Sequence, residues 1–213
     1  MPIDIASLRS DYTKKSLDRS HVADDPIVQF TLWFEEAIAS EVMEPNAMSL
    51  ATVKPSGQPS CRIVLLKGIE DQGFVFYTNY SSHKGAEINH SPLAALTFFW
   101  PELERQVRIE GRMERVPEAV SDAYFASRPY ESQLGAWVSP QSQVIADRDF
   151  LENRLQELKK EFEDKPLTRP PHWGGFLLRP SQIEFWQGRA SRLHDRLLYQ
   201  KENQKWTISR LAP

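Results

Sequence analysis

Apolar residues recur at helical spacing in the segment between Asp25-Pro26 and Pro45. An aspartate followed by a proline is typical of a helix start, because the carboxylate accepts free backbone N–H groups and proline suits the first turn. The apolar positions are Ile27, Phe30, Trp33, Phe34, Ala37, Ile38 and Val42. The pattern predicts an amphipathic helix that ends before Pro45 and packs its aromatic side chains into a core rather than around a cofactor.

Downstream of this helix the apolar residues alternate with a period of two, which predicts β-strands separated by turn-forming residues. The expected strands cover residues 48–53, 60–67, 74–78, 93–100, 105–116, 175–178, 182–186, 193–200 and 206–210. The first three strands are expected to form a meander. Further helices are expected at 82–90, 117–127 and 147–162, an irregular segment at 128–146 and a proline-rich linker at 165–172.

The order of these elements bears on the fold class. Strands that follow one another without alternating long helices argue against a doubly wound parallel sheet. The pattern therefore predicts a mainly β protein, an antiparallel barrel with flanking helices. Residues 1–22 mix charged and polar side chains with isolated apolar ones, so we expect a mobile N-terminal arm there and a single domain over residues 23–213.

Composition narrows the environment and the partners. The net charge of −3 lacks the basic excess of a general nucleic-acid binder. Cys61 is the only cysteine, which excludes an intrachain disulfide and favours a reducing, cytoplasmic compartment. Apolar runs are far shorter than the roughly 20 residues that span a bilayer, so no membrane partner is expected.

Familiar catalytic motifs are missing from the sequence. It contains no nucleophile elbow, no phosphate-binding P-loop, no dinucleotide fingerprint and no zinc-protease motif. The five histidines lack metal-ligand spacing, so a bound metal is not expected. If the chain is an enzyme, an organic cofactor should carry the chemistry.

The most informative stretch is residues 183–196, which combines an acid, a tryptophan and regularly spaced basic side chains. Strand alternation places Glu184 and Trp186 on one face, and after a turn it points Leu193 and Leu197 toward a core. The same alternation groups Arg192, His194 and Arg196 on the opposite face. An aromatic plane beside fixed cations suits a planar, anionic ligand. The alternative, an exposed polar face with one stray Trp, explains the joint spacing less well.

Two further clusters could bind anions. Residues 62–67 form an apolar strand with Arg62 and Lys67 at its ends, and it can equally be an ordinary edge strand with solvated ends. Residues 77–79 lead a strand into a helix start at residues 81–84, where hydroxyls, free N–H groups and a lysine can hold a phosphate. Every serine-capped helix looks similar, so the second signal is weak on its own.

A third cluster lies around a proline. Tyr124, Arg128 and Ser132 are spaced four apart, and Pro129 is expected to break the helix so that the set converges from a helix end and a loop. Arginine with two hydroxyls makes a good phosphate shell, although a solvated helix terminus would look the same. Amide and hydroxyl groups that could read the edges of a ring system are those of Gln106, Gln141 and Ser142.

Together these motifs resemble one family. Residues 183–196 read Ile-Glu-Phe-Trp-Gln, four further residues and Arg-Leu-His-Asp-Arg, which is similar to the C-terminal signature of the pyridoxine (pyridoxamine) 5'-phosphate oxidase family. Further similarity covers residues 62–67, 76–79, 104–106, 127–129, 135–138, 173–176 and 210–213. The resemblance implies an FMN-binding split β-barrel and a homodimer with its FMN sites at the subunit interface.

The resemblance also implies site residues. Its cofactor set is Arg62, Ile63, Val64, Leu65, Leu66, Lys67, Tyr77, Thr78, His83, Lys84, Gln106, Gln141, Ser142, Trp186 and Arg196. Its substrate set is Arg9, Tyr12, Lys67, Tyr124, Arg128, Ser132, Arg192, Leu193 and His194, of which Arg192 and His194 are the catalytic candidates. His83 stands where the family usually has an arginine, which removes one permanent charge from the expected phosphate site.

The implied reaction is oxidation of pyridoxine or pyridoxamine 5'-phosphate to pyridoxal 5'-phosphate, with O2 as electron acceptor. Two alternatives stay open at this point. The first is another flavin oxidase or reductase on the same barrel, which would not need the phosphate shell of Tyr124, Arg128 and Ser132. The second is a non-catalytic protein that binds FMN or pyridoxal phosphate, which would consume no O2.

Overall fold

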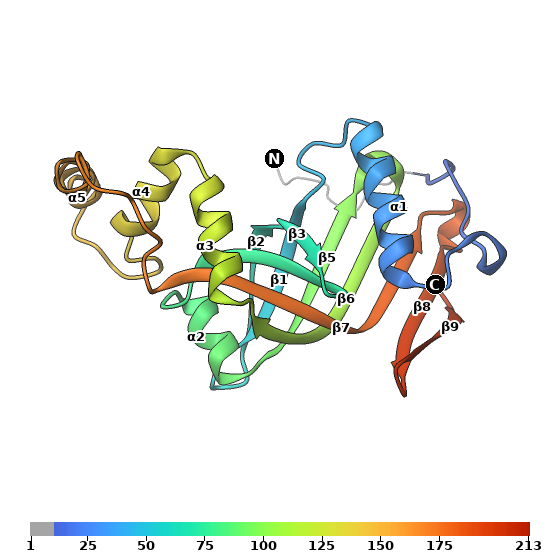
Figure 1. Ribbon diagram of the computed structural model, residues 1–213. Helices are drawn as coiled ribbons and strands as arrows, with labels where there is room; N and C mark the ends of the chain where they lie inside the picture. Colours follow the sequence, from blue (N-terminus) through green and yellow to red (C-terminus); the bar gives the residue numbers. More distant parts are fainter. Residues whose placement is uncertain (1–10) are drawn as a thin grey trace, which may run out of the picture. The chain divides into compact units, whose positions relative to one another are not determined.

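The computed structural model describes residues 11–213 (Figure 1). The chain gathers into two compact units, one made of residues up to 49, 95–110 and 180–213, the other of residues 50–94 and 111–179. The boundaries between the units fall inside strands β1 (Ala47–Val53), β5 (Leu93–Trp100), β6 (Arg105–Arg115) and β7 (Trp173–Gln187). The expected division into an arm and a single domain at residue 22 stays a prediction.

The strands that lie within residues 11–213 form one nine-stranded sheet in the order β2-β1-β5-β6-β7-β4-β3, with β8 paired to β7 and β9 to β8. The remaining strands are β2 (Pro59–Leu65), β3 (Gly68–Glu70), β4 (Gly73–Asn79), β8 (Asp195–Glu202) and β9 (Lys205–Leu211). The expected meander of the first three strands is wrong, since β4 pairs with β3 and β7 rather than with β2. Nearly all of β4 is buried, so it needs neighbours that a short hairpin would not supply.

Strand β7 joins two strands that the alternation pattern predicts separately. Its residues 173–178 pair antiparallel with residues 74–79 of β4, and its residues 182–187 pair antiparallel with residues 195–200 of β8. Pro180 lies between the two paired halves and has no N–H group to donate to a neighbouring strand. The strand therefore continues through Pro180, while the strand paired with it changes from β4 to β8.

Helix α1 (Pro26–Ala39) begins where the sequence predicts. The Asp25 carboxylate accepts the N–H of Ile27 at 2.7 Å, and Phe30 and Trp33 are buried, as the apolar stripe requires. Ile38 is the exception, because 55% of it is exposed. No helix within residues 11–213 is long and apolar enough to cross a membrane.

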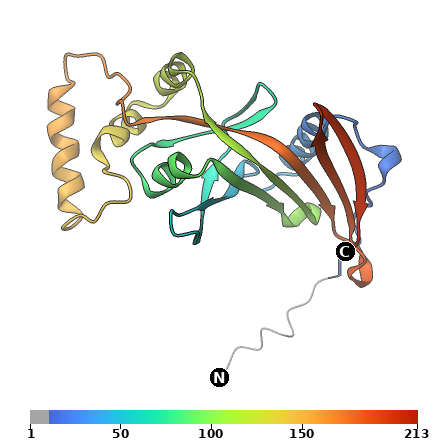
Figure 2. The same cartoon turned by 90° about the horizontal axis from the view of Figure 1, so that it is seen from below.

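Three more helices confirm their predictions, namely α2 (His83–His90), α3 (Glu118–Ser127) and α5 (Asp149–Glu161). Helix α4 (Tyr130–Val138) corrects the expectation of an irregular segment, and Figure 1 shows it near α5. Pro129 ends α3 as expected, but a proline is equally suited to precede a new helix, and the buried Leu134 anchors that helix. The C-terminal strands β8 and β9 form a hairpin. Figure 2 shows the segment that begins at residue 11 beside this hairpin.

Candidate active site

A pocket of about 510 Å³ lies in the unit formed by residues 50–94 and 111–179. Strand β2 and the residues after it contribute Arg62, Ile63, Val64, Leu65 and Lys67, and β4 contributes Tyr77 and Thr78. The other walls are Lys84, Tyr124, Arg128, Gln141 and Trp173. The structure thus brings together most of the expected cofactor residues and two members of the expected phosphate shell, Tyr124 and Arg128, and it adds Trp173.

Lys84 stands in the first turn of α2 and points its ammonium at neutral oxygen atoms. Its Nζ donates to Gln141 Oε1 at 3.0 Å and to Thr78 Oγ1 at 3.3 Å. Burial lowers the pKa of Lys84, and the nearby Arg62 lowers that pKa further. Ser82 caps the helix by accepting the N–H of Gly85 at 3.3 Å. A lysine at a capped helix start, with no carboxylate bonded to it among the described residues, suits an anion such as a phosphate.

Arg62 is held by a buried acid that sequence reasoning missed. Its Nη2 donates to Glu87 Oε2 at 2.9 Å and to Ser60 Oγ at 2.6 Å, and its Nη1 bonds Thr52. Burial alone would raise the pKa of Glu87, but hydrogen bonds from Thr52 and Arg62 outweigh it and the pKa is lowered. Glu87 therefore stays ionised and fixes the Arg62 guanidinium beside the pocket.

Three near-parallel aromatic rings form another part of the pocket wall. The rings of Tyr77 and Tyr124 stack at 3.8 Å between centroids, and Tyr124 and Trp173 lie within 3° of parallel. Burial raises the pKa of Tyr77 to about 12 and also raises that of Tyr124, so both hydroxyls stay protonated near neutral pH. A Cβ on Gly175 would lie 2.9 Å from the Tyr77 ring, so only glycine lets Tyr77 occupy this position.

Arg128 lies beside these aromatic rings. Its guanidinium lies 4.6 Å from the centroid of the Trp173 ring. Its Nη1 is buried, and within residues 11–213 it is the buried side-chain nitrogen or oxygen left without a hydrogen-bond partner. Burial lowers the pKa of Arg128, yet a guanidinium remains charged at any ordinary pH. A buried, charged donor without a partner is costly unless a ligand accepts from it.

Several predicted residues do not line this pocket. Leu66 is buried, Ser132 lies on α4, and Ser142 is an exposed residue with a φ of +73°. His83 is an exposed residue that begins α2 beside Lys84. Residues 62–67 have features of both open alternatives, because β2 ends the strand order and Ile63 is 64% exposed, while Arg62 and Lys67 line the pocket. An edge strand therefore lines the pocket.

The C-terminal candidates belong to the other unit, as does Gln106 on β6. The centroids of Trp186 and His194 lie 4.6 Å apart, and the Tyr12 ring meets Trp186 edge-on at 5.7 Å. His194 Nδ1 accepts the backbone N–H of Arg189 at 3.1 Å. Arg9 lies outside the described residues.

The protonation state of His194 follows from its surroundings. Burial lowers the pKa of His194 from its usual 6.5, and the Arg192 guanidinium lowers it further. The imidazole is therefore neutral at pH 7. Because Nδ1 accepts a hydrogen bond, the proton of the neutral ring is on Nε2.

Alternation predicted part of this region correctly. Ile183 and Phe185 are buried, and Glu184 faces Arg196, whose Nε donates to its carboxylate at 2.7 Å. The prediction for Leu193 is wrong, since 70% of it is exposed. Its segment is not a strand, because a 3-10 turn, η3 (Ala190–Arg192), precedes it and β8 begins only at Asp195.

The basic residues of this region differ in their partners. The hydrogen bond from Arg196 to Glu184 raises the pKa of Arg196. Arg108 donates to the same carboxylate at 3.1 Å. Arg192 adopts a φ of +61°, and its side chain makes no hydrogen bond or ion pair to another described residue. Within residues 11–213 no group of three or more His, Cys, Asp or Glu side chains is arranged to hold a metal ion.

Comparisons with known proteins show which family the chain resembles. Residues 34–161 match the family described as pyridoxamine 5'-phosphate oxidase, and residues 173–213 match the pyridoxine 5'-phosphate oxidase C-terminal dimerisation region. The pyridoxine/pyridoxamine 5'-phosphate oxidase of Gloeothece citriformis is 57% identical over 210 residues, which are 98% of this chain and 98% of that protein. The protein of the same name from Burkholderia thailandensis is 57% identical over 212 residues, 98% of this chain and 99% of that protein.

Solved structures show the same fold. PhzG from Burkholderia lata 383, in complex with tetrahydrophenazine-1-carboxylic acid, has a TM-score of 0.86 at 30% identity and covers 91% of this chain and 95% of its own. A pyridoxamine 5'-phosphate oxidase-related, FMN binding protein from Nostoc punctiforme has a TM-score of 0.70 at 20% identity, covers 86% of this chain and 97% of its own, and supports the fold alone. The expected antiparallel split barrel with flanking helices is confirmed. On the match of residues 34–161 and on relatives that are 57% identical over nearly the whole chain, the chain belongs to the pyridoxamine 5'-phosphate oxidase family, a family of oxidoreductases.

Proposed function

We propose that the chain oxidises pyridoxine 5'-phosphate and pyridoxamine 5'-phosphate to pyridoxal 5'-phosphate, with FMN as cofactor and O2 as electron acceptor. Each turnover would release H2O2, and the amine substrate would also release ammonia. The names of relatives that are 57% identical over nearly the whole chain support this reaction. The single exposed cysteine suits a reducing compartment, so a cytoplasmic location is part of the proposal.

The observation that carries the proposal is the unpartnered Nη1 of Arg128. A phosphate ester would accept from this buried donor and from the Tyr124 hydroxyl, which burial keeps protonated. Lys67 lines the same pocket, and no hydrogen bond or ion pair joins its side chain to another described residue. We assign these three residues, with Ser132, to the substrate phosphate.

The rest of the pocket fits FMN. Lys84 at the start of α2 and the clamped Arg62 would hold the flavin phosphate, and residues 63–66, Tyr77, Thr78, Gln141 and Ser142 would surround the cofactor. Once bound, FMN would accept a hydride from C4' of the substrate and pass the electrons to O2. The chain's own contribution is positioning, because fixed cations at two phosphates set how the two ring systems meet.

The C-terminal residues complete the assignment. Trp186, Arg196 and Gln106 are proposed for the cofactor, and Arg192, Leu193 and His194 for the pyridine ring. The planar guanidinium of Arg192 can cover a ring face, and the neutral His194 can donate through Nε2–H. The match of residues 173–213 to a dimerisation region supports a homodimer, whose subunit interface we propose as the location of the FMN sites.

The experiment compares phosphorylated with unphosphorylated substrate. Purified protein loaded with FMN should oxidise pyridoxine 5'-phosphate, with O2 uptake equal to the pyridoxal 5'-phosphate formed. Pyridoxine itself should react with a kcat/KM at least about 100-fold lower, because a charged hydrogen-bond set contributes roughly 1.5–3 kcal/mol per bond. Protein that binds no flavin, or that binds it and leaves both substrates unchanged, would overturn the proposal.

The likeness to PhzG favours one competing substrate class. PhzG was crystallised with a tricyclic carboxylic acid, and the pocket of this chain could offer Arg128 to a carboxylate as well. The same assay with tetrahydrophenazine-1-carboxylic acid separates the two. Faster turnover of the tricyclic acid than of pyridoxine 5'-phosphate would assign the chain to that other reaction.

A further inference from the structure

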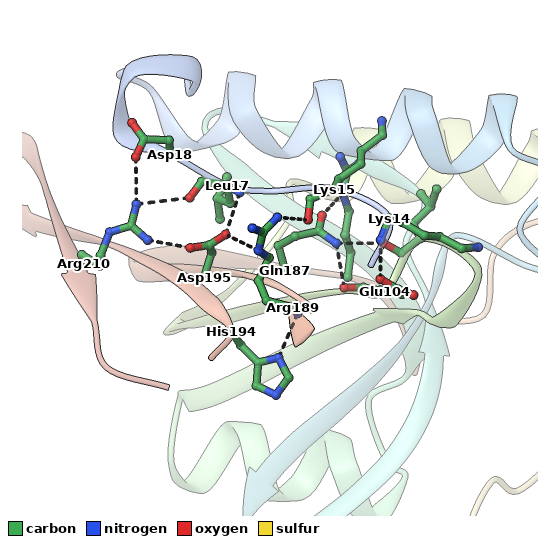
Figure 3. Close-up of polar contacts among 12 residues, drawn as sticks. Lys14, Lys15, Leu17, Asp18, Glu104, Gln187, Arg189, His194, Asp195 and Arg210 are labelled. Carbon is green, nitrogen blue, oxygen red and sulfur yellow. Dashed lines mark hydrogen bonds and ion pairs between the residues drawn. The ribbon is translucent and has the colours of Figure 1, made fainter. Parts of the chain in front are cut away.

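Residues 11–18, which we call the N-terminal strap, cross the unit that contains the C-terminal strands without forming helix or strand. Backbone groups of the strap are held by side chains from distant parts of the sequence (Figure 3). The N–H of Lys14 donates to Glu104 Oε2 at 3.0 Å, and the carbonyl of Lys15 accepts from Arg189 Nη1 at 3.1 Å. Irregular backbone fixed by specific side chains can be released by changing one of those side chains.

Asp195 is the centre of this fastening. One carboxylate oxygen accepts the N–H of Leu17 at 3.1 Å and lies 3.5 Å from Arg189 Nε, while the other accepts from Arg210 Nη1 at 2.8 Å. Arg210 also donates to the Leu17 carbonyl at 3.2 Å and to Asp18 at 3.1 Å. The Asp195 side chain is only 20% exposed, which limits screening of these charges by water. Figure 3 shows Asp195 between Arg210 and Arg189.

The strap delivers Tyr12 to the aromatic cluster. The Tyr12 ring lies 5.8 Å from His194 and 5.7 Å from Trp186. Gly188 makes this approach possible, because a Cβ on it would lie 2.7 Å from Tyr12 Cγ and 2.8 Å from Tyr12 Cβ. Those atoms belong to the base of the tyrosine side chain, so an alanine at position 188 would displace the strap itself.

Arg189 links the strap to the histidine. Its side chain bonds Lys15 and pairs with Asp195, while its backbone N–H donates to His194 Nδ1 at 3.1 Å. That last bond sets the tautomer of the imidazole. A single carboxylate thereby holds the strap directly and, through Arg189, holds the loop that orients His194.

We propose that Asp195 is a positioning residue for the substrate site: its carboxylate fastens the N-terminal strap and the Arg189–His194 loop together, so that Tyr12 and His194 reach the substrate as one preformed surface. The proposal rests on the proposed function for its kinetic part only. The fastening of the strap can be measured in the protein without substrate.

Asp195→Asn is the direct test, because it keeps the shape and removes the charge. Limited proteolysis with trypsin, which cleaves after lysine, should cut after Lys14 and Lys15 about tenfold faster than in wild-type protein. KM for pyridoxine 5'-phosphate should rise about tenfold, with kcat and FMN content changed less than twofold. Asp195→Glu should recover part of both effects. The matched control is Glu202→Gln, which removes a carboxylate from the other end of β8 and should match wild-type protein in both assays.

Gly188→Ala lifts Tyr12 by a steric route and leaves the carboxylate in place. It should raise KM and trypsin cleavage in the same way, and the double variant with Asp195→Asn should add little. A lower melting temperature for Asp195→Asn with wild-type cleavage and KM would reduce Asp195 to a fold-stabilising role and overturn the proposal. If Asp195→Asn does not fold, Arg189→Gln and Arg210→Gln replace it, and wild-type behaviour of both would equally overturn it. If the proposed oxidase activity is not found, KM cannot be measured. The rate of trypsin cleavage then tests by itself whether Asp195 fastens the strap.

Discussion

Basic side chains have different hydrogen-bond and ion-pair partners in the two units of the molecule. In the pocket, Lys84 bonds only neutral oxygens and the Nη1 of Arg128 bonds nothing among the described residues. Around the C-terminal strands, carboxylates match the guanidiniums: Glu184 serves Arg196 and Arg108, and Asp195 serves Arg189 and Arg210. Cations without internal anions can bind a ligand's charge, whereas paired cations mainly fix geometry.

Each region has one informative exception. Arg62 lines the pocket, yet the buried Glu87 forms an ion pair with it, so the protein itself fixes the orientation of the Arg62 guanidinium. Arg192 lies near His194, yet its side chain makes no ion pair within the described part of the chain. The partners of these basic residues therefore distinguish them better than their location does. We expect that removing a cation without an ion-pair partner weakens ligand binding most. Removing a carboxylate that holds such a cation in place should weaken binding indirectly.

The largest effect is expected for Arg128→Gln. Loss of the unpartnered guanidinium should lower kcat/KM for pyridoxine 5'-phosphate roughly 100-fold, near 2.7 kcal/mol, because charge-assisted bonds to the phosphate disappear. The rate with unphosphorylated pyridoxine should hardly change, so the preference for the phosphate ester collapses. Arg148→Gln is the control, since that arginine is 86% exposed and, among residues 11–213, forms an ion pair with Glu152 alone. An unchanged phosphate preference would break the contrast between the two regions.

Arg192→Leu comes next. We expect kcat to fall roughly 30-fold while retention of FMN stays within twofold of wild type, because this unpaired cation is assigned to the pyridine ring. Loss of FMN with kcat preserved in the loaded enzyme would move Arg192 to the cofactor set. Arg108→Leu, which removes a paired arginine, serves as the control.

The same variant also tests the electrostatics of His194. Burial and then Arg192 hold the pKa of His194 below 6.5, so activity that needs the neutral imidazole should decline only below that pH in the wild type. Removing the guanidinium raises this pKa toward 6.5, and the acid limb of the kcat/KM profile should move to higher pH. A limb that stays in place would show that another group titrates there.

Glu87→Gln should weaken FMN binding about tenfold without changing KM for the substrate, since it frees Arg62 rather than removing it. A flavin fluorescence titration measures the change. The pKa of Glu87 is lowered from 4.5, so its stabilising effect is complete above that pH and is lost as the pH falls below it. The variant should therefore lose less stability than wild type on acidification below pH 4.5. Glu87→Asp that behaves like the glutamine variant would show that geometry matters as much as charge.

The smallest effect is expected for His83→Arg. The exposed His83 begins α2 next to Lys84, where a permanent positive charge would add to the attraction for a phosphate. FMN should dissociate about threefold less readily at low salt, and the gain should shrink at high salt because exposed charges are screened. His90→Arg at the other end of the helix is the control. An equal gain there would assign the effect to net charge.

The sequence by itself predicted most of the strands and most helix boundaries, and its resemblance to a family named most of the residues that line the pocket. Asp25-Pro26 and Ser82 specify helix starts through local capping, and the resemblance of residues 62–67 and 77–78 to a family placed cofactor candidates that the structure does bring together. Helix α4 was missed because Pro129 ends one helix and precedes the next, and the three-residue strand β3 was missed as well. Local patterns of this kind depend on neighbours within about four residues.

Only the tertiary structure decided which distant groups meet. Trp173 approaches Tyr124 although the two residues lie 49 positions apart in the sequence, and Asp195 meets Leu17 although they lie 178 positions apart. Nothing in the spacing of Glu87 marks it as the partner of Arg62, and alternation could not show that a turn precedes β8 and exposes Leu193. Periodicity fixes which way a side chain points along its own element, while pairing and burial depend on how elements pack. That packing separates the unpaired cations of the pocket from the paired cations beside the strap.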